Sequence, residues 1–340
     1  MLAASRALAS GGLVIFPTET VYGLGIDADS PVARENVYRL KARDQGKPLT
    51  IHLADPGDLR GFVASPPPAA RRLIGRFWPG PLTLLLAGPD GKTLGFRCPA
   101  NDLARELIRQ SKVTVAATSV NRSGEAPAVD SVGLAPFVTE ARDSLAYVFD
   151  TGPTRLQQAS TVVSVTGSGW KIVRAGVLSP FEIKEAAVLR VLLVCGGNTC
   201  RSHMAESLLR SLLCRRHGIP GSPLEQAGYF LASAGTSAGT GAPASDHARE
   251  TMKAQGLDLS GHRSRHATPA LLREAHRIFV MTDSHRQVVL HLLAGATFPR
   301  VDLLDPDGRD VSDPFGGSLE DYQRTAARLR ALLEKRLEEL

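Results

Sequence analysis

The stretch VLRVLLVCGGNTCRSHMAESLLRSLLCRRHG, residues 188–218, decides the fold of the C-terminal half of the chain. It begins with an apolar run typical of a strand buried on both faces, passes through a glycine-rich turn, and ends with apolar residues at helical spacing. Gly218 stands where that helix would end. Strand-like and helix-like segments then alternate to residue 340, which predicts a parallel sheet with helices on both faces.

The same patterns predict the other elements. In the second half we expect strands at 229–235, 276–281 and 298–304 and helices at 244–256, 284–295 and 318–340. The first half is typical of an α/β or α+β sheet, with strands at 12–16, 49–53, 82–86, 113–117, 147–149 and 161–165 and helices at 32–42, 69–77 and 101–110. The polar stretch SPFEIKEA, residues 179–186, is interpreted as a link between domains at 1–180 and 188–340.

Length and composition agree with two ordinary globular domains. The chain has 340 residues, 43% hydrophobic and 22% charged, which excludes disordered, collagen-like and coiled-coil classes. No apolar run approaches the roughly 18 residues of a membrane span, and the first residues do not resemble a signal peptide. The four cysteines lack CxxC spacing, so we expect a reducing, cytoplasmic location. Because no apolar run is long enough for a membrane span, we expect no membrane partner.

The turn at residues 195–202 has the composition of a phosphate site with a nucleophile. Backbone N–H groups of a tight strand-to-helix loop converge on one point and bind phosphate oxygens, and Gly196 and Gly197 permit positive φ there. Arg201 offers a planar fork for two phosphate oxygens. The same positive surroundings are expected to lower the pKa of Cys195 and supply an attacking thiolate.

The remaining loop residues have supporting roles in this interpretation. Ser202 can donate a hydrogen bond to the sulfur, and Asn198 can hold the loop through its side chain. Phosphoryl transfer also needs an acid for the leaving group, for which Asp313 in a loop before the last helix is favoured over Asp305, although both precede proline. The plainer alternative for the whole stretch is a glycine-rich turn beside a buried cysteine.

Residues 189–340 resemble the low-molecular-weight protein tyrosine phosphatase family. The resemblance rests on VCGGNTCRS (194–202), SAGT (233–236), FVMT (279–282) and DPFGGSLEDY (313–322). It implies a phosphotyrosine-phosphatase-I-like α/β fold, Cys195 as nucleophile, Arg201 as phosphate binder, Asp313 as general acid, and a cysteinyl-phosphate intermediate. The related arsenate reductases use resolving cysteines near the C-terminus, and no cysteine follows Cys214.

Three positions in this half refine or depart from the family pattern. Thr199, where tyrosine-specific members carry Ile or Leu, is similar to the protein-arginine-phosphatase branch, although a phosphotyrosine substrate stays open. Cys200 either forms a reversible disulfide with Cys195 or packs as a small residue. His203 stands where the family usually has proline. His262 and His266 have metal-ligand spacing, but a solvated loop is the better interpretation and no metal site is expected.

The first half lacks the common nucleotide motifs GxxxxGK[ST] and GxGxxG. Its polar residues instead gather at strand ends, which are the usual ligand side of an open α/β sheet. Lysine and arginine with nearby hydroxyl and amide groups can hold a triphosphate and a carboxylate. Solvated loop charge is the competing interpretation for any single residue.

Residues 8–178 resemble the YrdC/Sua5 family of threonylcarbamoyl-AMP synthases. The matching segments are FPTETVYGLG (16–25), YRLKARDQGKPL (38–49), FWPGPLTLLL (77–86), GFRCP (95–99), TSVNRSGEAP (118–127), STVV (160–163) and VRAG (173–176). The resemblance implies a twisted-sheet α/β domain. It also implies conversion of ATP, L-threonine and bicarbonate to L-threonylcarbamoyladenylate and pyrophosphate, for N6-threonylcarbamoylation of tRNA adenosine 37.

The resemblance also implies two groups of site residues. The ATP group comprises Lys41, Arg43, Ser119, Asn121 and Arg174, and the threonine group comprises Thr18, Arg97, Thr118 and Ser160. Mg²⁺ is expected to arrive on the ATP phosphates. Partners are expected to be a phosphorylated protein and the tRNA or the machinery that transfers the threonylcarbamoyl group. A double-stranded-RNA-binding module is the alternative for this half, but the net charge of the whole chain, +6, is weak and does not demand nucleic acid.

Overall fold

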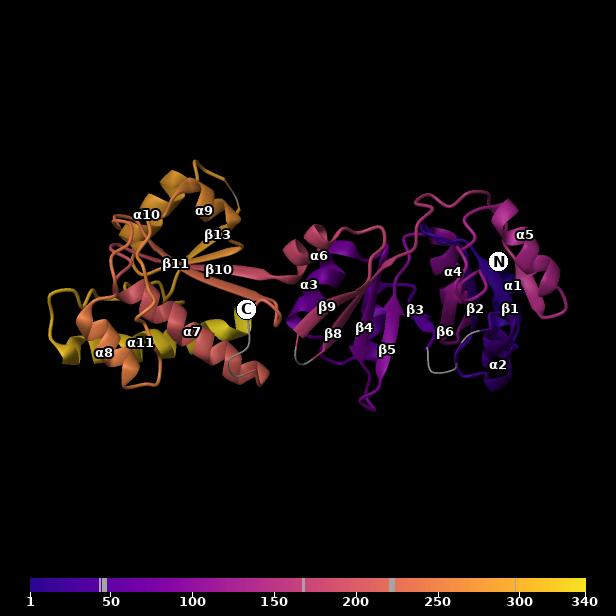
Figure 1. Ribbon diagram of the computed structural model, residues 1–340, viewed down its shortest axis with the longest axis horizontal. Helices are drawn as coiled ribbons and strands as arrows, with labels where there is room; N and C mark the ends of the chain where they lie inside the picture. The colour runs from indigo at the N-terminus through magenta and orange to yellow at the C-terminus, as the bar shows by residue number, and fades with distance from the viewer. Residues whose placement is uncertain (43, 45–47, 167–168, 220–223, 297) are drawn as a thin grey trace. The chain divides into compact units, whose positions relative to one another are not determined.

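The computed structural model describes residues 1–42, 44, 48–166, 169–219, 224–296 and 298–340. These residues form two compact units, Met1–Ala187 and Val188–Leu340 (Figure 1). The segment 179–186, predicted to be a polar link, is instead most of a helix, α6 (Pro180–Ala187), that belongs to the first unit. Ile183 and Ala187 are buried against α3 (Pro68–Phe77), because their spacing puts both on one helix face.

The described residues of the first unit form a mixed nine-stranded sheet with the order β7-β1-β2-β6-β3-β5-β4-β8-β9. The strands are β1 (Leu13–Phe16), β2 (Gly23–Asp27), β3 (Thr50–His52), β4 (Leu82–Ala87), β5 (Thr93–Arg97), β6 (Val115–Ser119), β7 (Leu145–Val148), β8 (Thr161–Thr166) and β9 (Gly169–Arg174). The other helices are α1 (Leu2–Ala9), α2 (Pro31–Leu40), α4 (Asp102–Ser111) and α5 (Ser131–Glu140), with a 3₁₀ turn at Pro56–Gly61.

The sequence patterns missed β2 and gave no bounds for the strand at Arg97, β5, because glycine interrupts both strands. In β2 the glycines are required by packing, since a Cβ on Gly25 would lie 2.6 Å from the Phe16 ring and one on Gly23 3.2 Å from it. Phe16 pairs in register with Gly23 across the antiparallel β1–β2 ladder, so the ring covers the glycine backbone. In a sequence pattern, a glycine within a strand is easily taken as the start of a turn. Here the glycines lie inside the sheet, where the Phe16 ring packs closely on their backbone.

The described residues of the second unit form a parallel sheet with the order β11-β10-β12-β13. The strands are β10 (Leu189–Cys195), β11 (Tyr229–Gly235), β12 (Arg277–Val280) and β13 (Arg300–Leu303). The helices α7 (Arg201–His217), α8 (Asp246–Lys253) and α11 (Leu319–Arg336) pack on one face, and α9 (Pro269–Glu274) and α10 (Asp283–Leu292) on the other. The predicted parallel sheet with two covered faces is confirmed.

The strand order of this sheet places the loop after β10 at the carboxyl ends of the strands. β10 lies between β11 and β12, so the chain leaves β10 to one side and later returns on the other. The crevice at such a switch point, outside the carboxyl ends of the strands, is where open α/β sheets bind ligands. Gly218 ends α7 in the left-handed conformation, with φ of 63°, as its position in the sequence predicts.

None of the helices in the described part of the chain is long and apolar enough to cross a membrane.

Candidate active sites

Cys195 ends β10 and is enclosed by the loop that follows it. Its Sγ lies 3.0 Å from Ser202 Oγ and accepts a hydrogen bond from the Asn198 backbone N–H at 3.3 Å. Cys195 is buried, and Ser202, the second residue of α7, has no solvent exposure. The strand, turn and helix therefore bring a thiol, a hydroxyl and a backbone donor to one point.

The loop takes its shape from residues other than the two predicted glycines. Neither Gly196 nor Gly197 has positive φ, so that expectation is wrong; the left-handed residue is Asn198, with φ of 55°. Gly235, at the end of β11, is the glycine that close approach requires. A Cβ on Gly235 would lie 2.2 Å from the Gly196 carbonyl oxygen and 2.8 Å from the Asn198 nitrogen. The sequence offered SAGT as a motif but no local reason for this glycine.

Side-chain hydrogen bonds hold Asn198 in this unusual conformation. Its amide nitrogen donates to Ser202 Oγ at 2.9 Å, and its amide oxygen accepts from the Arg265 backbone N–H at 2.9 Å. His262 Nε2 donates to the Asn198 carbonyl oxygen at 2.5 Å. Asn198 therefore ties the loop both to the start of α7 and to the segment before α9, as its polar side chain predicts.

Arg201 is paired with one of the two candidate acids. Its guanidinium is buried, forms an ion pair with Asp313, and donates to the Val311 carbonyl oxygen at 2.8 Å. The Asp313 side chain is 49% exposed, so it can also face a ligand. Asp305 is fully buried and pairs with Arg328. The structure therefore brings Asp313, and not Asp305, to Arg201.

The pKa of Cys195 differs from the expectation. Burial raises the pKa of the thiol, and this effect exceeds the lowering by the Ser202 and Asn198 hydrogen bonds and by the charge of Arg201. A lowered pKa is therefore wrong for the ligand-free protein. The sequence showed the positive groups around the sulfur, but it did not show how completely the sulfur is enclosed or that Asp313 offsets the charge of Arg201.

Asp313→Asn is expected to make Cys195 react with iodoacetamide at lower pH. A raised pKa keeps the thiol protonated at pH 7, so alkylation of the unmodified protein quickens as pH rises through that pKa. Removing the Asp313 charge leaves Arg201 uncompensated and lowers the pKa, and each unit of lowering increases the thiolate fraction about tenfold while the thiol is mostly protonated. Peptide mass spectrometry across pH 6–10 measures the profile. Asp307→Asn, at an exposed position, is the control; identical profiles for all three proteins would contradict the assignment.

The Cys200 side chain, directly before α7, contacts three hydroxyl groups. Its Sγ is 3.3 Å from both Ser245 Oγ and Tyr322 OH, and 3.6 Å from Thr199 Oγ1. Burial and the contact with Cys200 raise the pKa of Tyr322 to about 12, so its hydroxyl stays protonated. These contacts agree with the interpretation that Cys200 packs as a small residue. The reversible disulfide with Cys195 stays a prediction.

In the first unit, three predicted ATP residues meet in one cluster. Lys41 is buried, and its Nζ donates to the carbonyl oxygens of Ser119 and Asn121, each at 2.5 Å, and to Asn121 Oδ1 at 2.9 Å. Ser119 Oγ donates to Asn121 Oδ1 at 2.6 Å. Lys41 follows α2, whereas Ser119 ends β6 and Asn121 comes two residues later, so distant segments form this cluster. Arg43 lies outside the described residues.

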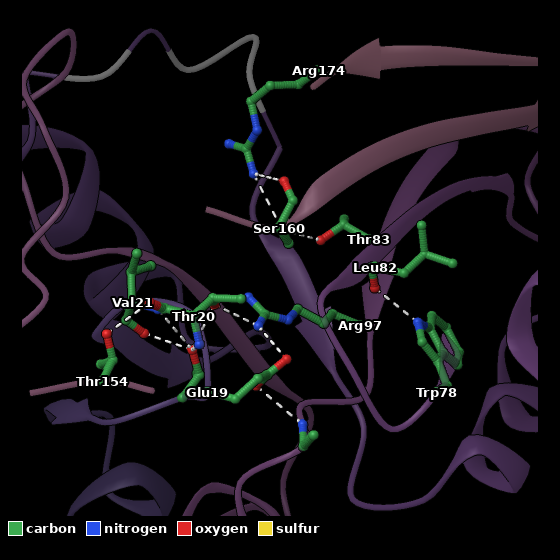
Figure 2. A network of polar contacts seen from close by, with 12 residues as sticks. Glu19, Thr20, Val21, Trp78, Leu82, Thr83, Arg97, Thr154, Ser160 and Arg174 are labelled. Carbon is green, nitrogen blue, oxygen red and sulfur yellow. Dashed lines mark hydrogen bonds and ion pairs between the residues drawn. The ribbon is translucent and has the colours of Figure 1, made fainter. Parts of the chain in front are cut away.

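A second cluster surrounds Arg97 at the end of β5 (Figure 2). The buried guanidinium donates to Glu19 Oε1 at 2.9 Å and to Thr20 Oγ1 at 2.6 Å. Thr18 Oγ1 lies 2.8 Å from Thr20 Oγ1, and Thr154 Oγ1 donates to the Thr20 carbonyl oxygen at 2.7 Å. Arg97 Nε is buried with no hydrogen-bond partner among the described residues.

The third cluster crosses β4 and β8. Ser160 Oγ lies 2.9 Å from Thr83 Oγ1, and Arg174 donates to the Ser160 carbonyl oxygen at 2.8 Å and to its Oγ at 3.2 Å (Figure 2). The structure therefore pairs Arg174, predicted for ATP, with Ser160, predicted for threonine. Within the described part of the chain, the Thr118 side chain joins none of these clusters by a hydrogen bond.

Comparison with known proteins places both units. The family model described as "Telomere recombination", of the Sua5/YciO/YrdC proteins, matches residues 6–176, and the model described as "Low molecular weight phosphotyrosine protein phosphatase" matches residues 190–340. The chain is a fusion of these two families. The expected family and the expected fold of each half are thereby confirmed.

Individual relatives agree with this assignment. The chain is 36% identical to the threonylcarbamoyl-AMP synthase of Bacillus subtilis over 53% of its own length and 54% of that protein, so it spans about half of that relative. It is 32% identical to the protein-arginine-phosphatase of Geobacillus stearothermophilus, over 44% of the chain and 95% of the relative. The structure of Pyrococcus abyssi Sua5 complexed with L-threonine shares the fold, with 24% identity and a TM-score of 0.51 over 68% of this chain and 88% of that one.

Several residues of the Sua5/YrdC unit lie in or beside the clusters but are not among the predicted site residues; Thr20 and Thr154 are described above. Glu19 pairs with Arg97, and Thr83 contacts Ser160. His52 is buried beside Arg97 in the β3–β5 register, and burial and that charge lower its pKa to about 4, so it is neutral at pH 7. A polar residue at the end of an apolar run was the available signal for His52, and an acidic residue within a buried segment was the signal for Glu19.

Proposed function

We propose that the Sua5/YrdC unit makes L-threonylcarbamoyladenylate and pyrophosphate from ATP, L-threonine and bicarbonate. The threonine amine attacks the carbon of bicarbonate, which gives the carbamate and releases water. A carbamate oxygen then attacks the α-phosphorus, the bond from that phosphorus to the bridging oxygen breaks, and pyrophosphate leaves; Mg²⁺ that arrives bound to the nucleotide would neutralise its charge. The observation that carries the proposal is the joining of Lys41, Ser119 and Asn121 into one cationic, donor-rich cluster in a chain similar to a synthase. The product would serve threonylcarbamoylation of tRNA adenosine 37.

The two other clusters supply donors for the amino acid in this proposal. Arg97 has a buried N–H group that no group in the described part of the chain accepts from, which suits a carboxylate. Thr83 and Ser160 add hydroxyls on the neighbouring strands. No three His, Cys, Asp or Glu side chains in the described ranges gather as a metal site, so the residues offer Mg²⁺ no separate cage.

Pyrophosphate release measured with ATP and bicarbonate tests the synthase proposal. Release that requires L-threonine, and that alanine or valine does not support, is the expected result. Release in no mixture, together with retention of double-stranded RNA in a filter-binding assay, would instead favour the RNA-binding alternative.

For the second unit we propose hydrolysis of protein phosphoarginine. The Cys195 thiol gives its proton to the Asp313 carboxylate, the thiolate attacks the phosphorus and the P–N bond breaks, and Asp313 passes that proton on to the leaving guanidine nitrogen. The resulting cysteinyl phosphate is hydrolysed by water, with Asp313 accepting the water proton and Ser202 stabilising the departing sulfur. The thiol enclosed by Ser202 and Asn198 beside the Arg201–Asp313 pair is the observation that supports this chemistry.

Thr199 supports phosphoarginine over phosphotyrosine. It is a half-buried residue of the loop, and a hydroxyl there can hydrogen-bond a phosphoguanidinium, which an aliphatic side chain cannot do. The 32% identity to a protein-arginine-phosphatase agrees with this choice.

Thr199→Ile is expected to reduce kcat/KM for phosphoarginine about tenfold or more and to leave or raise that for phosphotyrosine, because one substrate hydrogen bond is lost. Steady-state kinetics on free phosphoarginine and on a phosphotyrosine peptide measures both values, with Thr199→Ser as the matched control that keeps the hydroxyl. Equal phosphoarginine activity in the wild type and Thr199→Ile would remove the argument for this substrate.

A further inference from the structure

His203 stacks directly on His262. The two ring centroids are 3.6 Å apart, and the ring planes differ by 20°. His203 lies in the first turn of α7, two residues after Arg201, whereas His262 lies in the segment between α8 and α9. The stack therefore joins the helix that follows the phosphate loop to a segment distant in sequence.

His262 connects this stack to the loop itself. Its Nε2 donates to the Asn198 carbonyl oxygen at 2.5 Å. Asn198 is the left-handed residue of the loop, and its backbone N–H points at Cys195 Sγ. A non-glycine residue holds such a conformation only when its surroundings impose it. The orientation of the His262 ring therefore affects the position of the Asn198 backbone N–H, which donates to Cys195 Sγ.

The outer ring of the stack is also held. His203 Nδ1 lies 3.4 Å from Glu206 Oε2, which accepts from Ser233 Oγ at 2.8 Å, and Arg210 lies 3.5 Å from the other carboxylate oxygen. The Glu206 side chain is 16% exposed. His203 is therefore anchored to its own helix and, through Ser233, to β11, which leaves its flat face for His262.

We propose that His203 is a positioning residue of the phosphatase site, whose ring fixes the plane of His262 so that His262 holds Asn198 in the phosphate-binding conformation. This role rests on the proposed phosphatase function. A proline, the residue that the family resemblance leads one to expect at this position, has no aromatic face and cannot make the contact. The stack requires an aromatic ring and not a charge on residue 203.

Inorganic phosphate is a suitable probe of the loop, because it binds without turnover. His203→Ala is expected to weaken phosphate binding in calorimetry and to lower kcat/KM about tenfold, since a small displacement of binding groups has a large effect. His203→Phe keeps a flat ring and is expected to stay within about twofold of wild type, with an unchanged pH–rate profile. His203→Pro is expected to behave as His203→Ala. His291→Ala, at an exposed histidine on α10, is the control.

A double-mutant cycle separates positioning from general stability. If His203 acts through His262, adding His203→Ala to His262→Ala has little further effect on phosphate affinity, even where it changes the melting temperature. Phosphate affinity that is equal in wild type and His203→Ala overturns the proposal, and so does His203→Phe that is as impaired as His203→Ala. Should His203→Ala fail to fold, the Phe and Pro variants decide it by the same comparison. Wild-type protein that binds no phosphate would contradict the proposed function itself.

Discussion

Cys195→Ser is expected to abolish phosphatase activity and leave threonine-dependent pyrophosphate release at the wild-type rate. The serine alcohol stays protonated at pH values where a thiol ionises, so the nucleophile is lost while the enclosing contacts with Ser202 and Asn198 are conserved in size. Loss of a covalent nucleophile commonly reduces kcat by about 10³-fold or more. Paired assays of both activities on the intact chain measure the result.

The structure gives a reason to expect this independence. Cys195 and its partners lie within Val188–Leu340, and the three clusters of the synthase unit lie within Met1–Ala187. Residual phosphatase activity at a rate close to wild type would show that Cys195 is not the nucleophile. Loss of both activities in this one variant would indicate that the two units are coupled.

Lys41→Ala is expected to reduce threonine-dependent pyrophosphate release about a hundredfold or more and to spare the phosphatase. The substitution removes a buried cation and leaves the oxygens of Ser119 and Asn121 without their ammonium donor. An unpaired buried polar group destabilises its site by about 1–3 kcal/mol, so the segment after β6 should shift as well. Steady-state kinetics with ATP as the varied substrate measures the loss.

Two further variants of lysine make this test specific. Lys41→Met keeps the aliphatic length without the charge and is expected to be as inactive as Lys41→Ala. Lys92→Ala, at an exposed lysine paired with Asp90 in a turn, is the control and should not change the rate. Pyrophosphate release by Lys41→Ala at the wild-type rate would contradict the ATP assignment.

Sequence-based prediction was more accurate for residues that are close together along the chain than for residues that are far apart. Cys195, Asn198 and Ser202 occur within residues 195–202, where a strand passes through a short turn into a helix, so local patterns were enough to place them together. Asp313 lies far along the chain, and only the structure distinguishes it from Asp305, because the choice depends on which carboxylate reaches Arg201. The predicted link at 179–186 was wrong because the buried residues of this helix, Ile183 and Ala187, are recognisable as buried only with α3 present.

The amino-acid sequence by itself determined the two families, the parallel sheet of the second unit and the loop around Cys195, since contiguous apolar periodicity and turn residues act locally. Only the tertiary structure decided the Glu19–Arg97 pair, the Thr83–Ser160–Arg174 cluster and the need for Gly235 beside the loop. It also reversed the expected pKa shift of Cys195. The physical reason is common to all of these: strand register and burial depend on segments that are remote in sequence, and electrostatics at a site depends on how much water those segments exclude.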